Sequence, residues 1–249
     1  MYEKRVVAYV DIIGWSAACC SSDDAELRRV ADAAKAIHDA AYQYSREKKS
    51  QVASDPKAIV HPKTADTQWG AFSDNFVISM PESFGYRLLT PTTDICRRLL
   101  RLGFLTRGAI TFGDLHHLDN VVYGPAIVEA VALEQTAVYP RLVVSPAARL
   151  SLERTADESF LNNFCRQPLV EDHLGRLVVN TFSCGKDIDQ EGRTESMFEI
   201  ARRRWGTDQM MIENEQQIAR WSKGGDDHRL EKWLYMRQIM RECLKPLCG

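Results

Sequence analysis

Two short apolar segments of the chain each carry a single aspartate. Residues 6–13 are aliphatic or aromatic apart from Asp11, and residues 71–79 hold Asp74 among aromatic and β-branched neighbours. Both segments have the composition of strands. A carboxylate is costly to bury there unless another group compensates its charge. Two carboxylates brought together from separate strands suit Mg²⁺ or Mn²⁺, and a metal ion held in this way most often binds phosphates.

Length and charge restrict the class of protein. The chain has 249 residues, which suits one sizeable domain or a domain with an appendage. Its formal net charge is −2, which gives no reason to expect a nucleic-acid partner. No apolar stretch approaches the roughly 18 residues of a membrane span, and no signal-peptide core follows the N-terminus. The seven cysteines form no C-x-x-C pair, which favours reduced thiols. We therefore expect a cytoplasmic protein without a membrane partner.

The hydrophobic pattern alternates strands and helices through residue 184. In chain order it predicts a strand over 5–11, a helix from Ser22 or Asp23 to about Lys49, a loop with Pro56 and Pro62, strands over 67–72 and 75–80, a helix over 91–102, a strand over 104–112, a helix over 124–137, a strand over 142–145, and a hairpin of 169–170 with 176–182. Asp74 lies at the tip of the 67–80 hairpin. His116 and His117 follow the 104–112 strand, where we expect a solvated loop. This order predicts an α+β sandwich with a mostly antiparallel sheet.

The character of the chain changes at Gly185. Strand signals end and two helical segments follow, over about 194–222 and 227–247. We expect a main domain over 1–184 and a C-terminal helical extension over 185–249, which packs on the main domain or on a second subunit. The Gly-Gly-Asp-Asp sequence at 224–227 predicts the end of one helix and the cap of the next.

Four motifs occur in an order that resembles the catalytic domain of class III nucleotidyl cyclases. They are Asp-Ile-Ile-Gly-Trp-Ser at 11–16, Phe-Ser-Asp-Asn-Phe at 72–76, Arg-Gly-Ala-Ile-Thr-Phe-Gly at 107–113, and Tyr-Gly at 123–124 before a helix. The resemblance covers about residues 5–184, so it implies that 1–184 is the catalytic domain. It also implies a head-to-tail homodimer, in which one subunit supplies the metal aspartates and the other the base contacts of each active site.

The resemblance assigns roles to particular residues. It implies that Asp11 and Asp74 hold two divalent metal ions, Mn²⁺ or Mg²⁺, with the backbone carbonyl of Ile12 as a further ligand. Arg107 would bind a phosphate through its guanidinium fork. The ribose 3′-oxygen of a nucleoside triphosphate would attack the α-phosphate, with pyrophosphate as the leaving group.

The turn after the first strand supplies the other expected contacts to the substrate. The resemblance implies that the amides of Gly14, Trp15 and Ser16 bind triphosphate oxygens. This role agrees with the free N–H groups of a helix start. Tyr42 or Tyr44, late in the first helix, is a candidate donor to the base, with packing in the core or at a dimer interface as the alternative.

The base-reading residues of purine cyclases are missing. Those enzymes select the base at the positions of Gly70 and Val121, and they stabilise the transition state with Asn and Arg at the positions of Val128 and Ala132. The domain is therefore either inactive or specific for another base, and the retained metal and phosphate residues oppose inactivity. The pattern is most similar to the pyrimidine cyclases of Pycsar antiphage systems. That similarity implies a product, cyclic UMP or cyclic CMP, that acts on an effector protein.

We therefore expect a uridylate cyclase that converts UTP into cyclic UMP, with a cytidylate cyclase (CTP to cyclic CMP) as the alternative. The preference for UTP rests on the overall resemblance. Arg141 and Arg176 are candidates for the missing transition-state arginine, with ordinary surface charges as the alternative. Two other classes stay open: a non-catalytic nucleotide-sensing module on a cyclase fold, and a two-metal phosphohydrolase.

Overall fold

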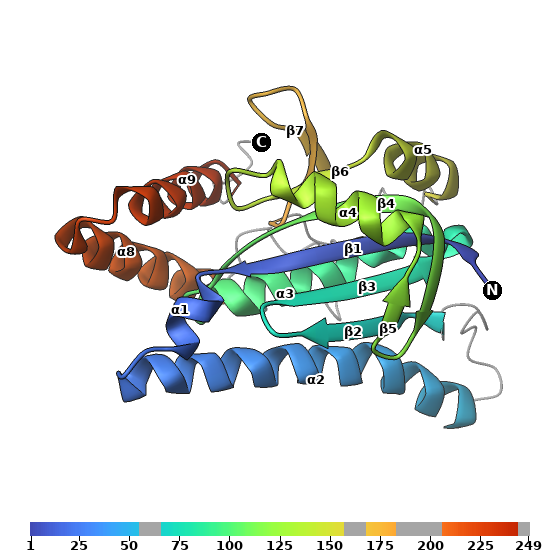
Figure 1. Cartoon of the computed structure of the whole chain (residues 1–249), viewed down its shortest axis with the longest axis horizontal. Coiled ribbons are helices and arrows are strands. Elements are labelled where there is room, and N and C mark those ends of the chain that lie inside the picture. The colour runs from blue at the N-terminus through green and yellow to red at the C-terminus, as the bar shows by residue number, and fades with distance from the viewer. Residues whose placement is uncertain (55–65, 157–167, 183–205, 244–249) are drawn as a thin grey trace, which may run out of the picture.

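The computed structural model describes residues 1–54, 66–156, 168–182 and 206–243 (Figure 1). The predicted loop with Pro56 and Pro62, and residues 194–205 of the first predicted C-terminal helix, lie outside these ranges. The described elements, in chain order, are β1 (Glu3–Ile13), α1 (Trp15–Cys19), α2 (Asp24–Ser54), β2 (Gln68–Phe72), β3 (Asn75–Pro81), the 3₁₀ segment η2 (Glu82–Leu88), α3 (Leu89–Arg101), β4 (Leu105–Leu118), β5 (Val121–Tyr123), α4 (Pro125–Gln135), β6 (Leu142–Val144), α5 (Pro146–Thr155), β7 (Leu169–Glu171), β8 (Leu177–Val179), α8 (Thr207–Gly224) and α9 (Asp227–Cys243).

The strands form one sheet in the order β2-β3-β1-β4-β6-β8-β7, and β5 pairs with the far end of β4. β4 runs parallel to β6, whereas the other described pairs are antiparallel. β1 is central, because β3 and β4 pair with it on either side along most of its length. The chain thus folds as an α+β sandwich with a mostly antiparallel sheet, which confirms the prediction.

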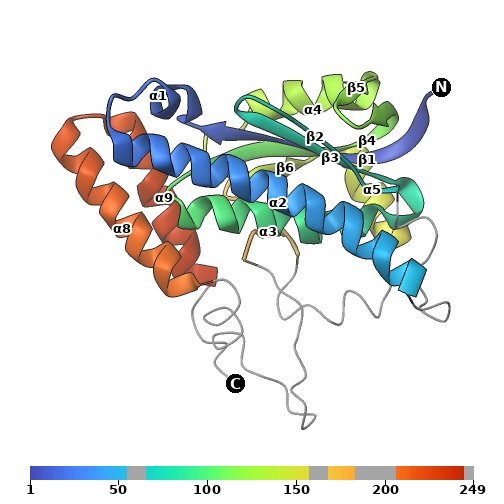
Figure 2. The ribbon, with the colours of Figure 1, turned by 90° about the horizontal axis from the view of Figure 1, so that it is seen from below.

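Helices cover both faces of the sheet (Figure 2). α2 and α3 lie on one face and α4 lies on the other. β1 reflects this division, because Val6, Ala8 and Val10 belong to the main core, whereas Val7 packs in a separate cluster with Ala126 of α4. The alternation is the period of two that a strand with both faces covered requires.

The end of β4 differs from the prediction. β4 does not stop near Gly113 but continues to Leu118 and pairs with β5, so the expected solvated loop at His116 and His117 is wrong. The two side chains point apart, as neighbours on a strand do. His116 packs against the ring of Tyr123, whereas His117 is buried with its Nδ1 2.8 Å from Ser79 Oγ.

The C-terminal helices α8 and α9 pack against α3 and the start of β4. Met210 of α8 and Trp233, Met236 and Met240 of α9 form a buried cluster with residues that include Leu105 at the start of β4. The predicted caps between the two helices are confirmed. Gly225 ends α8 with φ +70°, and the Asp226 carboxylate accepts a hydrogen bond from the Arg229 amide at 3.0 Å. None of the described helices is long and apolar enough to cross a membrane.

The buried His117 predicts a loss of stability on acidification. Burial, and then the nearby Arg5 charge, lower its pKa to about 4, while the backbone and carboxylate of Asp119 and the charge of Asp66 oppose this shift. Unfolding returns the ring to an ordinary pKa of about 6.5, so the unfolded chain binds more protons between these values. We expect stability to fall as the pH drops from 6.5 towards 4, by at most about 3 kcal/mol from this group.

Urea unfolding of His117→Gln at several pH values tests this expectation. The variant should be less stable than the parent at pH 7 and should show a flatter pH dependence. His116→Gln, which changes the neighbouring ring, should keep the parental dependence. Equal pH slopes for the parent and His117→Gln would contradict the assignment.

Candidate functional site

Asp11 and Asp74 lie in one cleft at the end of the central strands. Asp11 is near the end of β1, and Asp74 is in the turn between β2 and β3. The turn is fixed to β1 by a hydrogen bond from the Ile12 amide to the Asp74 carbonyl oxygen, at 2.7 Å. Ser73 takes φ +55° in this turn. The cleft has a volume of about 280 Å³. It is lined by Asp11, Ile12, Ile13, Gly14, Trp15, Ser16, Ala17, Asp74, Arg107 and Lys232.

Arg107 lies directly opposite Asp11 in the β1–β4 pairing. Its Nε is 3.0 Å from Asp11 Oδ2 and 2.5 Å from Glu134 Oε1. Glu134 is on α4, and its side chain is only 5% exposed. The pairing needs glycine at the next position, because a Cβ on Gly108 would lie 2.2 Å from the carbonyl oxygen of Tyr9. A larger residue there would push β4 away from β1 and separate Arg107 from Asp11.

Burial raises the pKa of Asp11, and the charge of Asp74 adds to this effect, whereas Arg107 opposes it. Burial also raises the pKa of Glu134, against the influence of Arg107. Both directions mean that negative charge in this cleft is only partly compensated. A bound cation would complete the compensation.

The donor set fits a hard divalent cation. Among the described residues no group of three or more His, Cys, Asp and Glu side chains gathers as a metal site. Asp11 and Asp74 supply two carboxylates, so further ligands would be backbone oxygens, such as that of Ile12, water or substrate. Oxygen ligands of this kind are those that Mg²⁺ and Mn²⁺ prefer. Arg107 contacts Oδ2 of Asp11, which leaves Oδ1 outside the ion pair.

The turn over 14–16 also lines the cleft. Gly14 takes φ +82° at the start of α1, a conformation that suits glycine. The indole of Trp15 is buried and packs against Phe104, with ring centroids 5.5 Å apart. The side chain of Trp15 therefore anchors the turn in the core, while the exposed Ser16 remains at the cleft.

Other expected contacts lie elsewhere in the chain. Tyr42 is on α2, half exposed, and is not part of the cleft lining. The side chain of Tyr44 lies outside the described residues. Arg141 and Arg176 both pair with Asp172 between β7 and β8, with nitrogen–oxygen distances of 2.5 and 3.2 Å. Neither arginine lines the cleft of Asp11.

Two residues at the site were missed by the sequence analysis. Glu134 follows Ala126 and Ala130 at intervals of four, and all three are buried on one face of α4. That spacing could have placed the carboxylate towards the sheet. Lys232 reaches the cleft from α9, and no local pattern near Asp11 indicates it.

The raised pKa of Asp11 predicts that the variant Asp11→Asn is more stable than the parent at neutral pH. A carboxyl whose folded pKa lies above its unfolded value contributes stability at low pH that is lost as the pH rises. An amide keeps an acceptor for Arg107 but never ionises. We expect the melting temperature of the metal-free variant at pH 7 to exceed that of the parent. Calorimetry at pH 7 and pH 4 checks this, because the difference should shrink at the lower pH. A lower melting temperature at pH 7 would mean that the ion pair with Arg107 outweighs burial.

Comparisons with known proteins place cyclases among the structural neighbours. No protein-family model and no curated protein sequence matches the chain. A bacterial light-regulated adenylyl cyclase matches with TM-score 0.45 and 11% identity, over 98% of this chain and 58% of its own. An adenylyl cyclase from P. aeruginosa matches with TM-score 0.44 and 10% identity, over 72% and 92% of the two chains. The catalytic core of a rhodopsin-guanylyl cyclase with converted specificity, in complex with ATPαS, gives 0.41 and 12%, over 72% and 96%. At these values, what this chain does must be inferred from its own residues.

Proposed function

We propose that the chain is a nucleotidyl cyclase, which converts a nucleoside triphosphate into a 3′,5′-cyclic nucleotide and pyrophosphate. The observation that carries this proposal is that Asp11, Asp74, Arg107 and the turn at 14–16 line one cleft. These residues come from the motifs that resemble class III cyclases. The cleft combines oxygen ligands for a metal ion with cationic and amide groups for phosphates, and this combination suits phosphoryl transfer.

Asp11 and Asp74, with the Ile12 carbonyl, would hold divalent cations, Mn²⁺ or Mg²⁺. When bound, the cations would lower the pKa of the attacking 3′-hydroxyl and neutralise charge on the phosphates. The backbone hydrogen bond from Ile12 to Asp74 fixes the turn that carries Asp74 to the end of β1, where Asp11 lies. The amides of Gly14, Trp15 and Ser16 would bind triphosphate oxygens.

Arg107 is well placed for a phosphate. Both carboxylates contact its Nε, and among the described residues no hydrogen bond engages its two terminal nitrogens, so these could bind an oxygen of the substrate. The same ion pairs hold the side chain in one orientation. A fork held in advance loses less freedom when it binds an anion.

We propose UTP as the substrate, with CTP as the alternative, because the residues with which purine cyclases select the base are missing at Gly70 and Val121. A Cβ on Gly70 would already lie 3.4 Å from the Asp119 carbonyl oxygen and from Val122, and 3.5 Å from His117 Nε2. A side chain at this position would therefore contact β5 and His117. The resemblance to Pycsar cyclases extends the proposal to cyclic UMP as a messenger in antiphage defence, acting on an effector protein.

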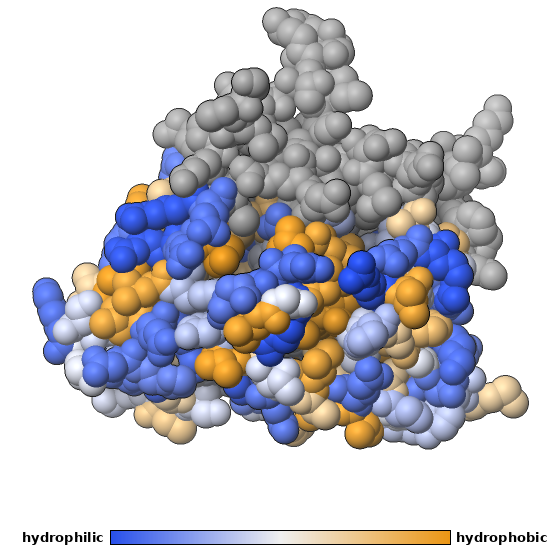
Figure 3. Space-filling model, turned by 90° about the horizontal axis from the view of Figure 1, so that it is seen from above, coloured by the Kyte–Doolittle hydropathy of each residue, from blue (hydrophilic) through white to orange (hydrophobic). Residues whose placement is uncertain are grey.

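Exposed apolar side chains support a homodimer with shared sites. Phe72 is 80% exposed and Val128 of α4 is 69% exposed, and Leu118, Val121 and Tyr123 are also exposed near β5. Figure 3 gives a view in which hydrophobic surface lies among polar side chains on the upper side of the molecule. Contact with a second copy of the chain would remove such side chains from water. A second subunit could bring Tyr42 towards the base.

A nucleotide-sensing module is the second candidate. Val128 and Ala132 stand where purine cyclases carry transition-state residues, and Arg141 and Arg176 are already paired with Asp172. Such a module would bind the triphosphate with a metal ion and release no pyrophosphate.

Incubation with Mn²⁺ and each of ATP, GTP, CTP and UTP separates these functions, with the products identified by mass and retention time. We expect cyclic UMP and pyrophosphate from UTP. Cyclic CMP alone would select the cytidylate alternative, and a cyclic purine would overturn the base assignment. Linear products would indicate a phosphohydrolase, and binding without any product would favour the sensing module.

Removal of either metal aspartate should abolish cyclisation. We expect Asp11→Ala and Asp74→Ala each to lower turnover by about 100-fold or more, since each removes charge that acts at the reacting phosphate. Asp114→Ala, on the same sheet but in an exposed pair with Lys4, is the matched control and should keep parental turnover. Size-exclusion chromatography checks that the fold and assembly are retained. Parental turnover in both cleft variants would overturn the metal assignment.

A further inference from the structure

The C-terminal helix α9 places a lysine in the proposed catalytic cleft. Lys232 lines the cleft together with Asp11, Asp74 and Arg107. It also lines a second hollow, of about 100 Å³, between α1 and the C-terminal helices. The two hollows share Ile13, Gly14, Ala17 and Lys232, so they adjoin at this lysine. Neither Asp11 nor Asp74 lines the second hollow, which therefore extends away from the metal aspartates.

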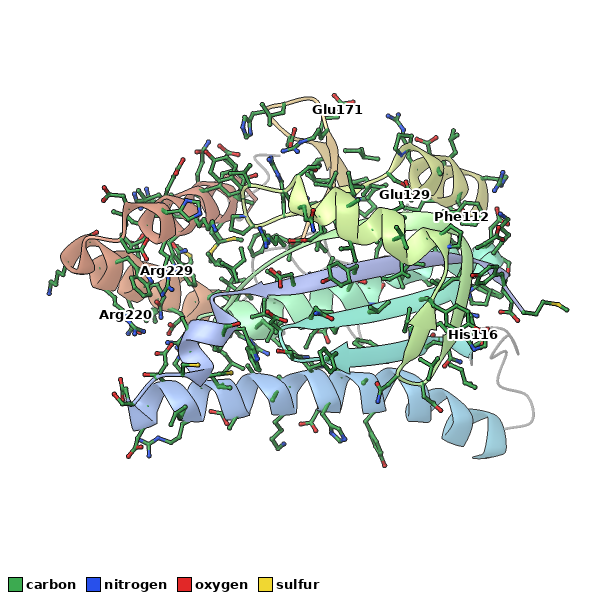
Figure 4. The ribbon with its side chains drawn as sticks, in the orientation of Figure 1. Phe112, His116, Glu129, Glu171, Arg220 and Arg229 are labelled. Atoms are coloured by element: carbon green, nitrogen blue, oxygen red, sulfur yellow. The ribbon has the colours of Figure 1, made fainter. Side chains whose placement is uncertain are left out.

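Positively charged side chains line the second hollow. Arg220 of α8 and Arg229 of α9 line it, and both guanidinium carbons lie over the ring of Trp221, at 4.9 and 4.6 Å. Figure 4 shows the two arginines near each other on the helix pair. Arg220 pairs with Glu26, and Arg229 pairs with Asp226. These carboxylates are thus already engaged.

Lys232 lacks such a partner. Within the part of the chain that the structure describes, neither a hydrogen bond nor an ion pair engages its ammonium group. The side chain is partly buried. Burial and the charges of Arg107 and Arg229 lower its pKa, whereas the charges of Asp226 and Asp11 oppose this shift. A partly desolvated ammonium without a direct ion pair is stabilised by an anion that can reach it, and Lys232 opens onto both hollows. The position thus predicts an anionic ligand.

We propose that Lys232 binds the terminal phosphates of the nucleoside triphosphate, so that the C-terminal extension completes the active site of its own subunit. This inference rests on the proposed cyclase function. The α-phosphate must lie near Asp11, Asp74 and Arg107 for the reaction, and the amides of 14–16 come next along the cleft. Beyond Gly14 the cleft leads past Lys232 into the second hollow. The β- and γ-phosphates, and then the pyrophosphate product, lie in that direction.

The packing of α9 positions the lysine. The next residue, Trp233, is 5% exposed and belongs to the buried cluster that contains Leu105 of β4. Its carbonyl oxygen accepts a hydrogen bond from Asn214 Nδ2 of α8 at 3.2 Å. The side chain of Lys232 therefore starts from a fixed backbone beside the sheet. A fixed origin favours a specific phosphate contact over a mobile surface charge.

The first experiment measures binding of inorganic tripolyphosphate by calorimetry, with and without Mg²⁺, to the full-length parent and to Lys232→Gln. We expect the variant to bind about tenfold more weakly, the effect of losing one charge-assisted hydrogen bond. Lys223→Gln makes the same change at an exposed position at the end of α8 and should bind like the parent. Lys232→Arg should keep most of the affinity. Parental affinity in Lys232→Gln, or no binding by the parent, would overturn the proposal.

Kinetics separate this proposal from the cyclase assignment. In an active parent we expect Lys232→Gln to raise the KM for the triphosphate by about tenfold, in step with the loss of tripolyphosphate affinity. Unchanged KM and affinity in the variant would overturn the role of Lys232 and leave the cyclase function intact. Lys232-dependent binding of tripolyphosphate by a parent that forms no cyclic product would overturn the cyclase function and leave an anion site at α9.

Discussion

The contact of one arginine with two carboxylates joins the parts on which the candidate site depends. Arg107 of β4 meets Asp11 of β1 and Glu134 of α4, so a single guanidinium connects the two central strands to the helix on one face of the sheet. Loss of Arg107 would leave both carboxylates uncompensated, and an uncompensated buried charge is strongly destabilising. The orientation of Asp11, the separation of the strands at Gly108 and the position of α4 are therefore mutually dependent.

Local patterns predicted the elements that surround this contact. The nearly continuous run of aliphatic and aromatic residues over 6–13 places β1, and the turn at Ser73 and Asp74 places the β2–β3 hairpin. Asp23 caps α2 as predicted, with its carboxylate accepting a hydrogen bond from the Ala25 amide at 2.9 Å. Each of these signals depends on a few neighbouring residues, which is why the sequence alone is sufficient for them.

Features that depend on distant residues could not be predicted in the same way. The length of β4 is set by its pairing with β5 and by the burial of His117 against Ser79, which lies 38 residues away. The position of Glu134 could have been predicted, because its spacing from Ala126 and Ala130 indicates a buried helix face. Lys232 was not, because its place in the cleft follows from how α9 packs on Leu105, and packing between distant segments leaves no periodic signal.

The residues that line the cleft come from distant parts of the chain, and their positions determine the order in which the cleft forms. Asp11 and Lys232 line the same cleft, although nearly the whole length of the chain separates them. During synthesis the N-terminal part of a chain emerges first and begins to fold before the rest is made. The sheet with its two aspartates can therefore form on the ribosome while the wall contributed by α9 is still missing. The complete cleft exists only after translation has passed α9, so a nascent chain carries Asp11 and Asp74 before it carries the side of the cleft that Lys232 lines.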